Sequence, residues 1–166
     1  MHIISVISVI FLITADQLAK KAALIYLAPV GSYPIINGVF ELSFVMNEGA
    51  SFGIMQGGRW FFVAATPFAL IAIFIYYLRL PRGRVYNWVR AALVMIFSGA
   101  FGNFIDRVRQ GYVIDYFYAR FINFPVFNIA DVFIVTGAFL FAAVIIFFVK
   151  DEKKDGGNEE AFTRDE

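Results

Sequence analysis

Apolar residues gather in four long runs that are separated by polar segments. The first run begins near His2 and continues into the twenties, because LIYLA resumes the apolar pattern after a polar stretch. The other runs cover about 60–80, 88–105 and 129–149. Each approaches the ~20 apolar residues that a helix needs to cross a bilayer. The pattern predicts four transmembrane helices in a single domain over residues 1–150.

The segment between the first two runs has the pattern of a hairpin. Asn37-Gly38 lies between two apolar stretches, which is the strongest short signal for a β-hairpin. After it, Phe40, Leu42 and Phe44 alternate with polar residues. We therefore expect a small β-sheet on the outer membrane surface. The predicted fold class is an all-α membrane protein of four transmembrane helices with a small extracytoplasmic β-sheet cradle.

Composition and charge support a membrane setting. Of the 166 residues, 60% are hydrophobic and 16% are charged, and the mean hydropathy is +0.72, outside the usual range of soluble domains. Arg79, Arg82 and Arg84 lie around the short loop between the second and third runs. With the lysines after the fourth run, they predict that this loop and both termini are cytoplasmic. The polar segment 151–166 is predicted to be a disordered cytoplasmic tail.

The residue inventory limits the chemistry. The chain has no Cys and one His, which excludes thiol catalysis, disulfides and the usual zinc ligand sets. Its basic residues end apolar runs and form no stripe that could track phosphates, so nucleic acid is not an expected partner. Catalysis must use carboxylates, hydroxyls, amides or lysine. We expect that the protein needs no metal or cofactor. We expect membrane lipids to surround its helices.

Acidic residues near the ends of the runs are candidates for function, because a carboxylate at membrane depth is costly. Asp16 and Lys20 are four residues apart and share a helix face, so they predict an internal ion pair. Asn103, Asp106 and Arg107 share a face at the end of the third run. Structural support is the preferred interpretation of both groups.

Two further carboxylates, Asp115 and Asp131, are sixteen residues apart in the sequence. Asp115 is expected on a loop among apolar neighbours. Asp131 lies at the start of the fourth run, three residues after Asn128, on a face that Val135, Ala138 and Ala142 continue. Either Asp alone is explained as well by a structural cap. Together they are predicted to converge and share one proton, so that one is an acid and the other a base in peptide hydrolysis.

The surroundings of the pair predict how it divides its roles. Asp131 lies in the first turn of a helix, where the helix dipole favours a carboxylate. Asp115 lies among apolar residues, where loss of water favours the neutral acid. We expect the shared proton mainly on Asp115, and Asp131 as the base that activates water.

Several ordered blocks resemble the bacterial lipoprotein signal peptidases, also called type II signal peptidases. The blocks are ADQLAKK in the first run, NEGASFG at 47–53, GNFIDRVRQGYVIDYF at 102–117 and FNIAD at 127–131. The resemblance implies that Asp115 and Asp131 are catalytic. It implies that nine other residues support the substrate or the pair, namely Asp16, Lys20, Asn47, Gly49, Asn103, Asp106, Arg107, Asn128 and Ala130. Ser51 and Tyr116 replace the Ala and Phe frequent in the family.

The resemblance also implies an activity and a location. The chain is expected to be a membrane-embedded aspartic endopeptidase of the bacterial cytoplasmic (inner) membrane, with its active site near the outer face. It would remove signal peptides from diacylglyceryl-modified prolipoproteins, cutting on the N-terminal side of the lipidated Cys, and would bind globomycin-like cyclic peptides. A transporter is disfavoured because internal repeats are not visible. A non-enzymatic assembly subunit does not explain two converging carboxylates.

The first outer loop is also predicted to move. Residues 31–59 combine an apolar underside with several glycines that free the backbone. These glycines are Gly49, Gly53, Gly57 and Gly58. We expect the loop to close over a bound substrate.

Overall fold

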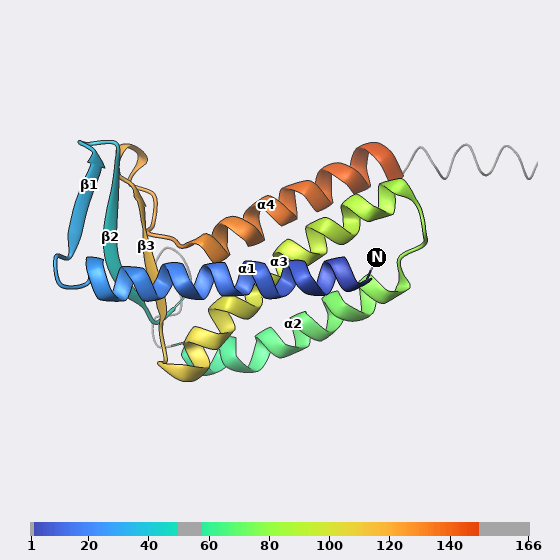
Figure 1. The fold of residues 1–166 in the computed structure, drawn as a ribbon, viewed down its shortest axis with the longest axis horizontal. Helices are drawn as coiled ribbons and strands as arrows, with labels where there is room; N and C mark the ends of the chain where they lie inside the picture. Colours follow the sequence, from blue (N-terminus) through green and yellow to red (C-terminus); the bar gives the residue numbers. More distant parts are fainter. Residues whose placement is uncertain (1, 50–57, 150–166) are drawn as a thin grey trace, which may run out of the picture.

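The computed structural model describes residues 2–49 and 58–149, which form four long helices and a three-stranded sheet at one end of the bundle (Figure 1). The helices are α1 (His2–Ala22), α2 (Arg59–Arg79), α3 (Arg84–Arg109) and α4 (Ile129–Val144). Two π-helical segments extend them, η1 (Ala23–Leu27) after α1 and η4 (Ile145–Val149) after α4.

The helices confirm the four predicted runs. All four are long and apolar enough to cross a membrane. Helix α3 is longer than the predicted 88–105, since it begins at Arg84 and ends at Arg109. Its two ends are polar, so a search for apolar residues stops short of them although the backbone is still helical. The predicted tail at 151–166 lies outside the described residues.

Helix α3 is the centre of the bundle and contacts α1, α2 and α4. Half of its most apolar stretch is buried, against 6% for α1 and α2, so the other helices expose most of their surface as lipid-facing helices do. Close contact with α4 depends on two glycines. A Cβ at Gly99 would collide with the carbonyl oxygen of Ala130, and a Cβ at Gly137 would lie 2.8 Å from that of Ala92.

The prediction of which face of α4 points into the bundle is wrong for the residues that follow Asp131. Val135 is 52% exposed and Ala138 is also exposed, whereas Ala130 and Gly137 are buried against α3. Because α4 is apolar on all sides, hydrophobicity does not choose its buried face. The face is set by small residues that allow two backbones to approach.

The sheet consists of β1 (Ser32–Ile36), β2 (Phe40–Asn47) and β3 (Val113–Ala119), paired antiparallel in that order. The first two strands form the predicted hairpin, and Gly38 in its turn has a φ of +73°. Asp115 lies on β3, not on the predicted loop, and its partner in β2 is Val45. A short apolar segment became a strand because a distant strand pairs with it.

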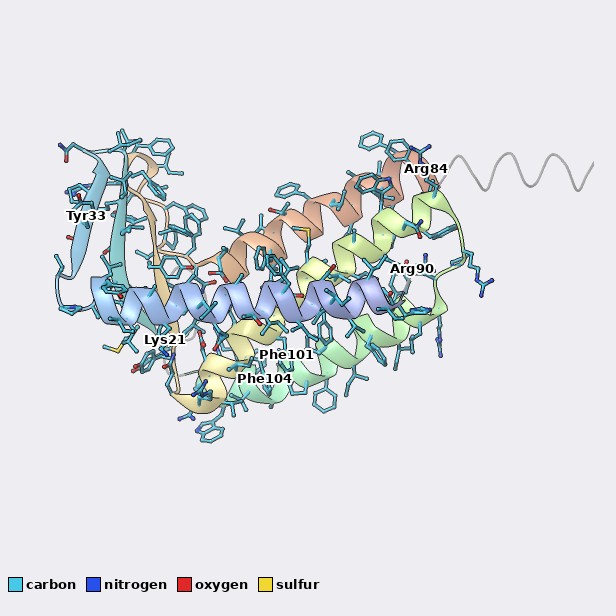
Figure 2. The ribbon with its side chains drawn as sticks, in the orientation of Figure 1. Lys21, Tyr33, Arg84, Arg90, Phe101 and Phe104 are labelled. Atoms are coloured by element: carbon cyan, nitrogen blue, oxygen red, sulfur yellow. The ribbon has the colours of Figure 1, made fainter. Side chains whose placement is uncertain are left out.

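The sheet rests on the end of the first helix. Ala23 and Leu27 of η1 form a buried cluster with Ile114 and Tyr116 of β3. Leu42 and Phe44 pack against the same cluster, which confirms the predicted apolar side of β2. This packing fixes β3, which carries Asp115. Because β3 connects α3 to the turn before α4, it also constrains the start of α4, where Asp131 lies. Figure 2 shows Tyr33 at the sheet end and Arg84 at the opposite end of the bundle.

Candidate active site

The turn before α4 brings Asp115 and Asp131 to the same residue, Asn128. Asn128 caps α4: its Oδ1 accepts from the Asp131 N–H at 3.0 Å, and its own backbone N–H donates to Asp131 Oδ2 at 3.0 Å. Its side-chain Nδ2 donates to Asp115 Oδ1 at 2.6 Å. One completely buried asparagine therefore contacts both carboxylates.

A second asparagine, Asn103 of α3, holds Asp131 from the other side. Its Nδ2 donates to Asp131 Oδ1 at 2.8 Å, and its Oδ1 accepts from Lys20 Nζ at 2.8 Å and from Asn128 Nδ2 at 3.2 Å. Because a lysine ammonium only donates, the amide oxygen of Asn103 must face Lys20. The amide NH2 must then face Asp131. Lys20 of α1 thus fixes the orientation of a group that binds the pair.

Lys20 is the centre of a buried ion cluster. It lies 2.9 Å from Asp16 and 2.8 Å from Asp106, and the exposed fraction of these three side chains is 5% or less. The predicted Asp16–Lys20 pair is confirmed. Gln17 closes the cluster by donating to Asp106 Oδ1 at 3.0 Å and to Asp16 Oδ2 at 3.2 Å. The cluster joins α1 to α3 directly beneath Asn103.

Arg107 follows Asp106 but faces the end of β2. Its Nη2 donates to the carbonyl oxygen of Gly49 at 2.9 Å, and its guanidinium lies 4.7 Å from the ring centroid of Phe62 on α2. The Gly49 N–H donates to Asn47 Oδ1 at 3.0 Å, and Asn47 Nδ2 donates to Asp115 Oδ2 at 2.8 Å. Arg107 therefore positions Asn47, which in turn binds Asp115.

Ala130 is the one predicted site residue outside this network. It is fully buried, and its carbonyl oxygen lies against Gly99. A Cβ at Gly102 would lie 2.5 Å from Asp16 Oδ2 and 3.7 Å from the Ala130 Cβ. Ala130 thus contributes close packing of α4 on α3, and the other predicted residues form one connected set around Asp115 and Asp131.

The two carboxylates differ in their surroundings. Asp115 is 2% exposed, and burial raises its pKa to about 6. The hydrogen bonds from Asn47 and Asn128 lower this pKa, and the nearby charge of Asp131 raises it. Asp131 is only half-buried. Burial therefore favours the protonated form of Asp115, whereas Asp131 is the more exposed of the two carboxylates.

Three further residues complete the site. Tyr116 is buried, burial raises its pKa, and its hydroxyl accepts from the Ile129 N–H at 3.4 Å, so it stays neutral beside the pair. Gln17 lies in the polar block of α1, so the sequence contained a signal for it. Phe62 had none, because its contact with Arg107 depends on the packing of α2.

The fold and the site define a multi-pass membrane protein whose paired carboxylates are held by amide groups. The family model described as signal peptidase (SPase) II matches residues 8–147. The chain belongs to this family, and it is therefore a peptidase by family.

Named relatives and solved structures agree with this assignment. The lipoprotein signal peptidase of Caldanaerobacter subterraneus subsp. tengcongensis is 43% identical over 86% of this chain and 96% of its own length. That of Clostridioides difficile is 43% identical over 86% and 95%. A bacterial membrane enzyme solved by the in meso method superposes with a TM-score of 0.75 at 32% identity, covering 90% of both chains. The family resemblance of the sequence blocks is confirmed.

Proposed function

We propose that this chain is an aspartic endopeptidase that removes signal peptides from diacylglyceryl-modified prolipoproteins, cutting on the N-terminal side of the lipidated Cys. The relatives named as lipoprotein signal peptidases support the substrate class. The observation that carries the catalytic type is the contact of Asn128 with both Asp115 and Asp131. The pair requires no metal or cofactor.

The reaction follows from the two surroundings. Asp115 holds the shared proton, and ionised Asp131 takes a proton from water. The resulting hydroxide attacks the scissile carbonyl carbon while the Asp115 carboxyl donates a hydrogen bond to the carbonyl oxygen. A proton then passes to the nitrogen of the lipidated Cys as the C–N bond breaks. The products are a signal peptide with a new carboxylate and a lipoprotein with a free amine.

Asn47 and Arg107 have positioning roles in this scheme. The Asn47 amide donates to Asp115 Oδ2 and the Asn128 amide donates to Asp115 Oδ1, so the two amides together fix the orientation of the Asp115 carboxyl group. Arg107 holds the backbone at Gly49 and so fixes Asn47. The Lys20 cluster holds Asn103 and, through it, Asp131.

We place the protein in the bacterial cytoplasmic membrane with both termini cytoplasmic and the pair near the outer face. The arginines around the α2–α3 loop support this orientation, because they lie at the end of the bundle opposite the sheet. Residues 1–150 act as one peptidase domain, followed by the tail at 151–166. The sheet then meets the lipid-modified end of the substrate.

Residues 31–59 are proposed to close over the substrate, and globomycin-like cyclic peptides to bind in its place. The glycines of this segment support the proposed lid, because glycine leaves the backbone more conformational freedom than other residues do. Part of the lid, including Ser51, Gly53 and Gly57, lies outside the described residues. Spin labels at the β1–β2 turn and on α2 should give a distance distribution that narrows with globomycin. An unchanged distribution would contradict the lid.

The decisive experiment is cleavage of a synthetic lipopeptide by the purified full chain in detergent. Mass spectrometry should find one new amine, on the diacylglyceryl-Cys, and no cut in the same peptide without the lipid. Chelators should leave the rate unchanged. Absence of cleavage by a folded protein, or loss of activity with a chelator, would refute the proposed function.

A further inference from the structure

A second polar position lies far from the pair, at the end of the bundle opposite the sheet. Arg90 of α3 is 5% exposed; its Nη2 donates to the carbonyl oxygens of Leu80 and Pro81 at 2.8 Å, and its Nη1 donates to Asn87 Oδ1 at 3.4 Å. Its Nε is buried and has no hydrogen-bond partner among the described residues. No carboxylate of the described residues forms an ion pair with it. A buried guanidinium normally faces a negative group.

The charged residues around the α2–α3 loop are all positive. Arg79, Arg82, Arg84 and Arg90 lie in or around the α2–α3 loop, and no residue from 58 to 105 is acidic. Positions 2–15 and 132–149 contain no acidic residue either. Figure 2 shows Arg84 and Arg90 together at this end. These segments therefore supply no negative charge to Arg90.

Arg90 lines a groove of about 600 Å³ between α1 and α3. Asn87 and Arg90, early in α3, form its end near the α2–α3 loop, and Ile4, Ile7 and Phe11 of α1 continue it as an apolar wall. The groove thus has a cationic head and an apolar body. This distribution of polarity matches a phospholipid whose phosphate lies at the membrane interface.

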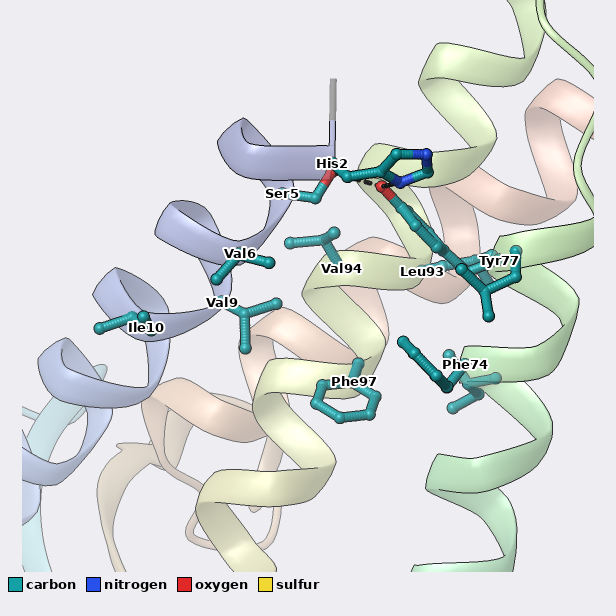
Figure 3. Close-up of a pocket in the computed structure, with 12 residues that line it drawn as sticks. His2, Ser5, Val6, Val9, Ile10, Phe74, Tyr77, Leu93, Val94 and Phe97 are labelled. Carbon is teal, nitrogen blue, oxygen red and sulfur yellow. Dashed lines mark hydrogen bonds between the residues drawn. The ribbon is translucent and has the colours of Figure 1, made fainter.

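A neighbouring cavity provides a comparison, because none of the described residues that line it is an Asp, Glu, Lys or Arg. It has a volume of about 370 Å³ and lies between α1, α2 and α3 (Figure 3). Its polar groups bond to each other: Tyr77 Oη donates to Ser5 Oγ at 2.8 Å and lies 3.4 Å from His2 Nδ1. Its polar groups thus have partners already, so nothing in it selects a charged ligand.

We propose that the groove between α1 and α3 binds one phospholipid with a net negative headgroup, whose phosphate is held by Arg90 and Asn87. A zwitterionic lipid is disfavoured because its own cation would lie close to the Arg90 guanidinium. The lipid neutralises the buried guanidinium and fixes the end of α1 against α3. The site is independent of the peptidase reaction, since it lies at the other end of the helices.

The test is native mass spectrometry of the full chain in detergent, titrated with phosphatidylglycerol and with phosphatidylcholine of the same acyl chains. We expect one bound phosphatidylglycerol, held about tenfold more tightly than phosphatidylcholine. Arg90→Gln should remove this preference. Arg82→Gln, which removes the same charge from the exposed loop, should keep it. Equal binding of the two lipids by the wild type, or an unchanged preference in Arg90→Gln, would overturn the proposal.

A second pair of variants leaves Arg90 in place, because Arg90 also holds the α2–α3 loop. Ala91→Phe fills the groove from an exposed position of α3 and should abolish bound phosphatidylglycerol. Ala138→Phe adds the same ring to the exposed face of α4 and should not. Retained binding in Ala91→Phe would overturn the site. Binding that appears only after Asp151→Asn and Glu152→Gln would show that the acidic tail occupies Arg90, and would also overturn the proposal.

Discussion

The two ends of the bundle hold α3 against its neighbours by opposite means. Near the sheet, the contacts pass through buried polar side chains such as Lys20, Asn103 and Asn128. At the other end, Val89 and Leu93 of α3 form a buried apolar cluster with Val144 of α4 and with residues of α2.

Both arrangements join the same helices, but their costs differ. Buried charges and amides must be desolvated, and they stabilise the fold little or not at all compared with apolar residues of the same volume. At the apolar end the contact of α3 with α4 is made by Val89, Leu93 and Val144, and the one buried polar side chain described there, Arg90, holds the α2–α3 loop and not α4. The polar end therefore has a purpose besides stability, and the purpose we assign is to hold Asp115 and Asp131.

The largest expected effect is the loss of either carboxylate. Asp115→Asn and Asp131→Asn should each lower kcat by at least about 10³-fold, because an amide cannot transfer the proton in question. Both variants should stay folded and inserted. Glu41→Gln is the matched control, since Glu41 pairs with the exposed Arg120 on the sheet and should leave kcat unchanged. Normal turnover by either Asn variant would exclude the pair as the catalytic group.

Removing the lysine at the polar end should cost stability and activity together. Lys20→Met leaves Asp16 and Asp106 buried without their cation, which costs about 3–5 kcal/mol. Leu93→Ala at the apolar end should cost a similar free energy, about 2–5 kcal/mol. Melting curves in detergent measure both. Activity per folded molecule should fall for Lys20→Met and stay normal for Leu93→Ala, and equal behaviour of the two variants would erase the contrast between the ends.

The buried acid predicts how stability depends on pH. The folded protein keeps the Asp115 proton up to a pKa of about 6, whereas the unfolded chain releases it near 3.8. Between these values the native state binds more protons, so the free energy of unfolding falls as the pH rises. The loss is about 3 kcal/mol and is complete above pH 6. Asp115→Asn should lack this component, and parallel pH curves for the two proteins would argue against it.

The smallest effects belong to the positioning residues. Asn47→Ala and Arg107→Ala should lower kcat about 10- to 100-fold while leaving measurable activity, because they orient Asp115 without transferring a proton. Val45→Ala, on the same strand but outside the hydrogen-bond network, is the control. Wild-type kcat in both variants would return Asn47 and Arg107 to a structural role.

The sequence predicted the parts of the molecule that depend on local pattern. Apolar runs located the helices, and Asn37-Gly38 located the hairpin. Strand β3 was missed because its partner β2 lies about 70 residues earlier in the chain. The buried face of α4 was missed because Ala130 and Gly137, not its larger apolar residues, make the contact.

The sequence indicated several of the contacts around Asp115 and Asp131. Spacing indicated the pairing of Asp16 with Lys20, and the expected location of Asp115 and Asp131 at the outer ends of the runs indicated that they converge. The resemblance of the family blocks suggested the supporting residues. Spacing did not show that Lys20 also binds Asp106 and Asn103, since these contacts join helices that are far apart in sequence. The path from Arg107 through Gly49 to Asn47 is likewise a product of the packed structure.

The central claim is that the proton of the carboxylate pair resides on Asp115. Infrared difference spectroscopy of the protonated carboxyl band, recorded from pH 4 to 8, tests it directly. The band should titrate near pH 6 in the wild type and be absent in Asp115→Asn. In Asp131→Asn it should titrate at lower pH, because the Asp131 charge that raises the pKa of Asp115 is gone. Survival of the wild-type band in Asp115→Asn would contradict the account.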